Sequence, residues 1–204
     1  MSISDGVSIE RNAVRILFIL YFCNDRPPDE PLHLFDDYTH FISSESKLQK
    51  VDFWIRYPDH LAAALLRGCE NLSLINRADD IKQTIRRIFQ DREPTLRWIP
   101  MRKYLHGAYE PLDDAIGFLS SRLLAYLRVE ERGHRKRYFL TRKGSRAVEA
   151  MLQECPITQW YAERCQLINS FFGHLNGFEI RQLQYLEENY DLAQYSDMIG
   201  RVET

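Results

Sequence analysis

The sequence predicts a mainly α-helical fold with one small β-hairpin, and three observations support this class. Apolar residues recur at helical spacing from Leu112 onward and predict one long amphipathic helix, with a stripe at Ile116, Leu119, Leu123, Leu124 and Leu127. The period then changes to an apolar–polar alternation over 137–140, beyond a polar turn at Gly133, which predicts a hairpin. Thr141 is expected to cap a second helix, whose apolar face is Ala147, Val148, Met151 and Leu152.

The preceding part of the chain is predicted to be helical with irregular breaks. An apolar run predicts a buried helix over 8–23, the prolines of 24–31 predict a loop, and a short packed helix is expected over 32–41. Ser43 or Ser44 is expected to cap a helix that breaks at Tyr57-Pro58, and the next helix is expected to end at Gly68. A helix over 78–90, a strand over 94–99 and a short helix over 100–105 then lead to the long helix.

After Pro156 a further helix is predicted, closed by Asn176-Gly177, and a last helical stretch is expected from Ile180 to Leu192. The order of elements over 78–152 is that of a winged helix-turn-helix, in which the hairpin is the wing. The prediction is therefore a winged helix-turn-helix with additional N- and C-terminal helices. Its regions are an N-terminal helical region packing on the core (1–75), a winged-helix domain (76–155) and a C-terminal helical extension (156–204).

Composition is that of an ordinary soluble globular protein. Hydrophobic residues make up 45 % and charged residues 27 % of the 204, so a core can form without disulfides or metals. The four cysteines form no C-x-x-C pair, and reduced thiols in a cytoplasmic protein are expected. The apolar run over 16–23 is far shorter than the ~20 residues that cross a bilayer, and neither a signal peptide nor membrane contact is expected.

Basic residues are concentrated around the predicted hairpin. The segment from Arg122 to Arg146 holds nine bases and two acids, which is +7, so the rest of the chain is −9 for a net charge of −2. Bases on a wing can reach the phosphate backbone of double-stranded DNA. The candidate nucleic-acid-binding residues are Arg122, Arg128, Arg132, His134, Arg135, Lys136, Arg137, Arg142, Lys143 and Arg146. Contact with a protein, or plain solvation, is the alternative interpretation of the same residues.

The start of the predicted long helix argues against a reader of base sequence. A helix that enters the major groove presents its first turns to the bases. Here those turns carry Glu110, Asp113 and Asp114, whose carboxylates repel phosphates. Binding without sequence selection, or binding as part of a complex, is therefore more natural than operator recognition.

No catalytic motif is present, and the chain is predicted not to be an enzyme. One conceivable metal cluster combines Asp36 and Asp37 with His33 and His40, but the polar face of a surface helix explains these residues better. No cofactor and no metal are expected. Acids at Asp79-Asp80 and Asp113-Asp114 lie at predicted helix starts, where the helix dipole already accounts for them.

Two segments resemble known families. Residues 137–144 (RYFLTRKG) resemble the wing-to-helix signature of bacterial winged-helix proteins, in which an aromatic-Leu-Thr closes the second wing strand. Residues 47–62 (KLQKVDFWIRYPDHLA) are similar to a segment of the small middle subunits of bacterial three-component ABC-ATPase defence systems, including Lamassu-type systems. The second resemblance implies an accessory protein that bridges an SMC-like ATPase and an effector, often a nuclease, in anti-phage or anti-plasmid defence.

Two main hypotheses on function follow, with an enzyme as a remote third. The first is a non-catalytic accessory subunit of such an ATPase complex, with partner-binding anchors expected at Trp160, Phe171 and Phe172. The alternative is a dimeric winged-helix transcription regulator, which requires a symmetric homodimer and a DNA-reading helix.

Overall fold

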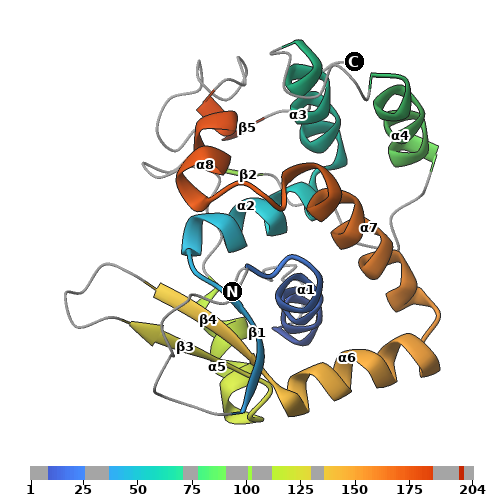
Figure 1. Ribbon diagram of the computed structural model, residues 1–204. Coiled ribbons are helices and arrows are strands. Elements are labelled where there is room, and N and C mark those ends of the chain that lie inside the picture. The colour runs from blue at the N-terminus through green and yellow to red at the C-terminus, as the bar shows by residue number, and fades with distance from the viewer. Residues whose placement is uncertain are drawn as a thin grey trace, which may run out of the picture.

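The computed structural model describes residues 9–25, 37–70, 78–90, 101–102, 112–129, 136–185 and 198–199 (Figure 1). It is mainly helical with a small three-stranded antiparallel sheet. The helices are α1 (Ile9–Phe22), α2 (Glu45–Arg56), α3 (Pro58–Glu70), α4 (Ala78–Gln90), α5 (Asp113–Ser121), α6 (Arg142–Glu154), α7 (Ile157–Phe172) and α8 (Gly177–Tyr185). The strands are β1 (Tyr38–Ile42), β2 (Met101–Arg102), β3 (Ala125–Val129), β4 (Lys136–Thr141) and β5 (Met198–Ile199).

Helix α1 is the centre of the fold, as predicted from its apolar run. Residues 16–20 are at most 3 % exposed. The helix contacts α2, α5, α6 and α7 as well as strands β1 and β4, and Figure 1 shows these elements around it. A helix that is apolar on all sides is stable only when it is enclosed in this way. Its one buried charge, Arg15, is paired with Asp52 of α2.

The sheet has the strand order β1-β4-β3, so a strand from the first predicted region pairs with the hairpin of the second. The prediction of a short helix over 32–41 is wrong in the part that the structure describes, because Tyr38–Ile42 form a strand. This segment is rich in aromatic and β-branched residues, and pairing with β4 decides its conformation. The inner face of the sheet contributes Ile42, Ala125, Tyr138 and Leu140 to the core.

The long helix predicted through Leu127 is also wrong, because α5 ends at Ser121. The backbone N–H of Leu124 donates to the Leu119 carbonyl, and that of Leu123 to the Ser120 carbonyl, which is a Schellman motif. Leu123 occupies the left-handed position of this motif, with φ 58°, and is 70 % exposed. Leu127 lies on β3.

Several predicted helix boundaries are confirmed. Ser44 caps α2, α3 begins at Pro58 after the break at Tyr57, and the Thr141 hydroxyl caps α6 by accepting from the Gly144 N–H at 3.0 Å. The predicted helix over 78–90 is α4.

Three boundaries differ. Helix α3 continues past Gly68 to Glu70, Met101–Arg102 is a strand paired with β5 instead of a helix, and α7 ends at Phe172. Asn176 starts α8 instead of closing α7, because its side chain accepts from the N–H groups of residues 178 and 179. The predicted strand over 94–99 and the end of the last predicted helix lie outside the described residues.

Candidate nucleic-acid interface

The hairpin separates the predicted bases into two groups. Arg128 lies opposite Arg137, and Lys136 opposite Val129, toward the end of the hairpin where β3 ends and β4 begins. Arg122, Arg142, Lys143 and Arg146 lie at the other end, and we call these four residues the hairpin-base cluster. The six residues of β4 span five intervals of ~3.3 Å, which places the groups about 17 Å apart. Arg132, His134 and Arg135 lie outside the described residues.

The hairpin-base cluster gathers bases from the end of α5 and the start of α6. The Lys143 ammonium donates to the Arg122 carbonyl at 2.9 Å, and the Arg122 guanidinium lies 3.5 Å from the ring centroid of Phe118. Arg142 pairs with Asp37 at 3.0 Å, with both side chains more than 60 % exposed, and Arg146 follows one turn later on α6. The positive end of the α6 dipole adds to the charge. The result is an exposed basic surface built from two elements.

At the opposite end of the hairpin, an ion pair connects β4 to helix α2. Lys136 donates to the Glu45 carboxylate at 2.7 Å, and both side chains are about one third exposed. An ion pair at this exposure contributes roughly 0.2–1 kcal/mol. Lys136 therefore holds the hairpin against the start of α2, and part of its charge is neutralised there.

A groove of about 610 Å³ lies between this end of the hairpin and the starts of α2 and α8. Lys136 and Arg137 line it from the hairpin, and Glu45 is the one acid among the lining residues that the structure describes. Arg137 also faces Arg128 across the two strands, and like charges in this position repel each other. Phe178, which is 62 % exposed, adds an apolar side chain to the lining.

An aromatic cluster on the outer face of the sheet stiffens the hairpin. Phe139 lies between Phe41 and Tyr126, with ring centroids 5.9 and 4.9 Å away, and Tyr38 meets its edge at 5.2 Å. Burial, with a smaller contribution from neighbouring charges, raises the pKa of Tyr126 to about 12. This cluster was not predicted from the sequence, because its rings come from three strands and depend on the pairing of β1 with β4 and of β4 with β3.

The start of α5 is acidic, as predicted from the sequence, and it is exposed. Asp113 and Asp114 are exposed in the first turn, and Gly117 is the next exposed position on that side of the helix. A surface with two carboxylates and a glycine provides little for the hydrogen-bonding edges of bases.

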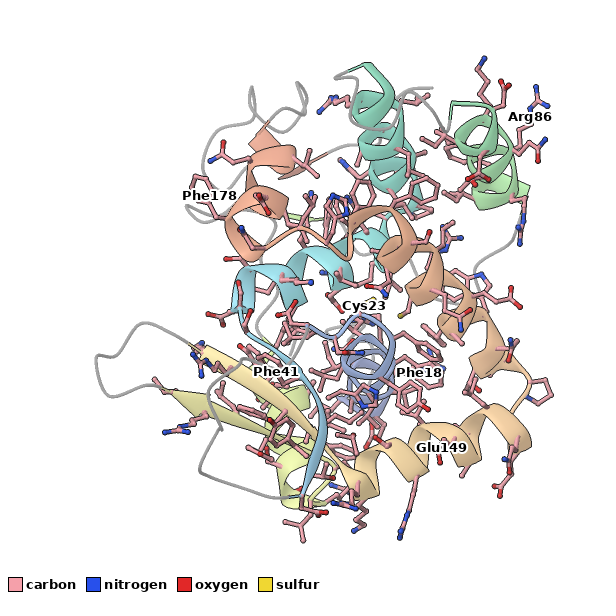
Figure 2. The ribbon with its side chains drawn as sticks, in the orientation of Figure 1. Phe18, Cys23, Phe41, Arg86, Glu149 and Phe178 are labelled. Carbon is pink, nitrogen blue, oxygen red and sulfur yellow. The ribbon has the colours of Figure 1, made fainter. Side chains whose placement is uncertain are left out.

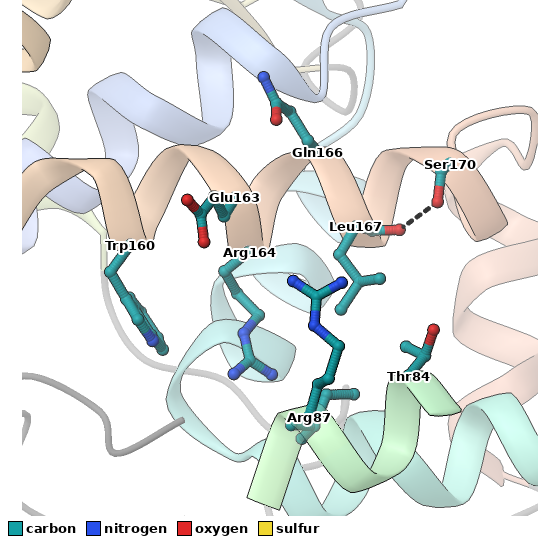
Figure 3. Close-up of a pocket in the computed structure, with 9 residues that line it drawn as sticks. Thr84, Arg87, Trp160, Glu163, Arg164, Gln166, Leu167 and Ser170 are labelled. Carbon is teal, nitrogen blue, oxygen red and sulfur yellow. Dashed lines mark hydrogen bonds between the residues drawn. The ribbon is translucent and has the colours of Figure 1, made fainter. Parts of the chain in front are cut away.

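The predicted partner-binding aromatics differ in accessibility. Trp160 is partly exposed on α7 and lines a groove between α4 and α7 (Figure 3). Phe171 and Phe172 are 2 % and 3 % exposed, and Phe172 contacts Trp54 with ring centroids 4.5 Å apart. These two rings belong to the core, which corrects the expectation that they are surface anchors.

Nothing in the described ranges forms a cluster of three residues able to hold a metal ion. Of the conceivable cluster, His33 and Asp36 lie outside the described residues, and Asp37 pairs with Arg142. His40 lies against the Tyr21 ring at 4.8 Å, and burial lowers its pKa, with the charge of Glu149 acting in the opposite direction.

In comparisons with known proteins, no family model, no curated protein and no solved structure matches the chain. Across the described part of the chain, no helix has the length and apolar character required to cross a membrane.

Proposed function

We propose that this protein is a winged-helix module that binds the phosphate backbone of double-stranded DNA without selecting a sequence. The hairpin-base cluster is the observation that carries the proposal. It places exposed side chains of Arg122, Lys143 and Arg146 around the positive end of α6, next to the two strands of the wing. Backbone contacts of this kind position a protein on a duplex but carry no base information.

The order of elements supports the winged-helix assignment. Helix α1 and strand β1 come before α5 and the hairpin β3–β4 in the chain, and β1 pairs with β4 of the hairpin. Helices α2–α4 and strand β2 are then an insertion between β1 and the helix that precedes the wing. The acidic start of that helix, at Asp113 and Asp114, supports binding without base readout.

A matched pair of charge reversals tests the proposal. Lys143→Glu with Arg146→Glu removes two exposed bases of the hairpin-base cluster, and Lys82→Glu with Arg86→Glu makes the same charge change on the exposed side of α4. Fluorescence anisotropy with duplexes of unrelated sequence, over a series of salt concentrations, measures the affinity and its salt slope. The first double variant should lower the slope by about two units, since each phosphate contact contributes ~0.9. The α4 variant should keep most of the wild-type slope.

Two results would contradict the proposal. One is an equal loss of binding in both double variants, which would mean that only net charge matters. The other is a strong preference of the wild-type protein for one duplex sequence, which would favour a transcription regulator.

We further propose that the module serves as a non-catalytic accessory subunit of an SMC-like ATPase complex in defence against phage or plasmids. The support is the resemblance of residues 47–62, which cover most of α2 and the start of α3. Phe53, Trp54 and Ile55 are fully buried there, so the similarity lies in a core helix and supports a shared fold more than a shared docking surface. Co-expression with the products of adjacent genes tests this role, and elution of the chain by itself would argue against it.

A further inference from the structure

Leu123, between α5 and β3, has the most exposed large apolar side chain in the part of the chain that the structure describes. It is 70 % exposed, ahead of Phe178 on α8 at 62 %, which is labelled in Figure 2. A single exposed leucine is ordinary on a protein surface. Two further features, its backbone conformation and its basic neighbours, distinguish Leu123 from such a residue.

Leu123 occupies a backbone conformation that favours glycine. Its φ is 58°, and among the described residues it is the one non-glycine residue with a positive φ. Glycine is the usual residue at this position of a Schellman motif, and the apolar contact of the motif involves the residue that follows. Leu124 provides that contact by packing on the core. The side chain of Leu123 is therefore not required by the motif, and strained positions of this kind are concentrated at functional sites.

Hydrogen bonds on both sides fix the backbone that carries this side chain. The N–H of Leu123 donates to the Ser120 carbonyl at 3.0 Å, and its carbonyl accepts from the Thr141 hydroxyl at 2.8 Å. The preceding carbonyl, of Arg122, accepts from the Lys143 ammonium at 2.9 Å. The turn is thus tied to α5 and to the start of α6, so little conformational entropy is lost when Leu123 meets a partner.

The neighbours of Leu123 are the residues of the hairpin-base cluster. Arg122 precedes it, Lys143 contacts the same turn, and both are exposed. Arg142, in its exposed ion pair, and Arg146 continue this basic surface along α6. A partner that is complementary to the surface has negative charges around an apolar interior. Duplex DNA has this arrangement, because its phosphates lie outside and its stacked bases lie inside.

We propose that Leu123 is a wedge that enters the minor groove of duplex DNA and partly unstacks one base step, while the basic side chains of the hairpin-base cluster contact the phosphates beside it. This inference rests on the proposed function and adds the residue that deforms the DNA. Apolar wedges on basic surfaces kink a duplex in this way. Unstacking costs least where a base pair is mismatched, so a mismatched duplex should bind more tightly than a matched one. Such a preference depends on the shape of the DNA and not on its base sequence.

An anionic membrane also combines negative charge with an apolar interior. Stable attachment to a membrane requires a broad apolar face or a lipid anchor, and one leucine side chain supplies neither. The duplex is therefore the better partner for Leu123, and vesicles of anionic phospholipid serve as a competing probe in the test.

A short duplex with 2-aminopurine beside a single mismatch tests the wedge. The fluorescence of 2-aminopurine is quenched by stacking, so it should rise when the wild-type protein binds. Leu123→Ala should abolish this rise and weaken binding about fivefold, since the apolar contact is lost. It should keep the wild-type salt slope, because no phosphate contact is removed. Leu123→Met, which retains a long apolar side chain, should restore most of the affinity and of the fluorescence rise.

The chain offers a matched control in Leu66, which is 47 % exposed on α3. Helix α3 lies at the top of the view in Figure 1, and the start of α6 lies at the bottom. Leu66→Ala makes the same chemical change, and it should leave the affinity, the salt slope and the fluorescence rise as in the wild type. Since Leu123 is mostly exposed, Leu123→Ala should fold like the wild type.

Three results would overturn the wedge. The first is wild-type behaviour of Leu123→Ala on the mismatched duplex, and the second is binding of the wild-type protein with no rise in fluorescence. The third is binding to the vesicles that is lost in Leu123→Ala while binding to DNA is unchanged. Failure of the proposed function gives a different result, because Lys143→Glu with Arg146→Glu would then leave the salt slope unaltered. If that slope falls as expected and Leu123→Ala still behaves as the wild type, only the wedge is refuted.

Discussion

Replacement of Asp52 by asparagine should be among the most destabilising single changes in this protein. Asp52 is 1 % exposed and accepts from Arg15 Nε at 2.5 Å and from Arg56 Nε at 2.9 Å. The variant removes the carboxylate that Arg15, itself 1 % exposed, meets inside the core between α1 and α2. Breaking a buried pair in this way costs about 3–5 kcal/mol.

Urea denaturation measures the effect. At a denaturant slope of roughly 2–3 kcal/mol per molar, the midpoint should fall by about 1–2 M. Asp113→Asn is the control, because Asp113 is exposed at the start of α5 and should change the free energy of unfolding by ~0.5 kcal/mol or less. A loss below ~1 kcal/mol for Asp52→Asn would refute the reasoning. Arg56→Gln, at a partly exposed position, gives a milder test of the same network if the asparagine variant does not fold.

The same pair predicts a pH dependence. Burial alone would raise the pKa of Asp52, but the charges of Arg15 and Arg56 outweigh it and the pKa lies below the ordinary value. The stabilisation by Asp52 is therefore complete above the unfolded pKa of about 3.9 and is lost as the pH falls through the folded value. The difference in free energy of unfolding between wild type and Asp52→Asn should shrink as the pH drops below about 4. A difference that stays constant would contradict the ion-pair explanation.

Two further substitutions test the backbone geometry of the wing. Leu123→Gly should stabilise the protein by ~0.5–1 kcal/mol in urea denaturation, because glycine adopts φ 58° without strain and the leucine side chain is 70 % exposed; a loss of stability would mean that this side chain packs on something. Gly144→Ala should lower the free energy of unfolding by about 1–3 kcal/mol in the same assay, because a methyl group there would overlap the Leu124 carbonyl and the Leu140 side chain. An unchanged midpoint would show that α6 can move away from β4 at no cost.

The local features of the fold were predictable wherever a short stretch decides them. The helical run at 16–20, the Ser44 and Thr141 caps and the break before Pro58 each depend on neighbouring residues, and each is confirmed. The strand at 38–42 was not predictable in this way, because its partner β4 lies about a hundred residues further along the chain. The apolar residues at 116–127 fit a continuous helical stripe, and this pattern does not reveal the Schellman motif that ends α5. The end of α5 was therefore predicted wrongly.

The candidate interface was predictable in composition but not in arrangement. The charge count located the basic segment, and it could not separate Lys136, which pairs with Glu45, from the exposed bases around Lys143. The exposure of Leu123 gave no signal in the sequence, because its spacing placed it on the apolar stripe of a long helix. Only the Schellman motif at the end of α5 turns this side chain toward solvent.

Hydrophobic period, capping and charge are local properties, so they were enough to predict the mainly helical class, the hairpin, most helix starts and the location of the basic segment. Tertiary structure alone decided that β1 completes the sheet, that Phe171 and Phe172 belong to the core and that Arg15 finds Asp52. It also decided which of the basic side chains face solvent. These outcomes depend on contacts between distant segments, where burial and desolvation outweigh the preferences of any short stretch of chain.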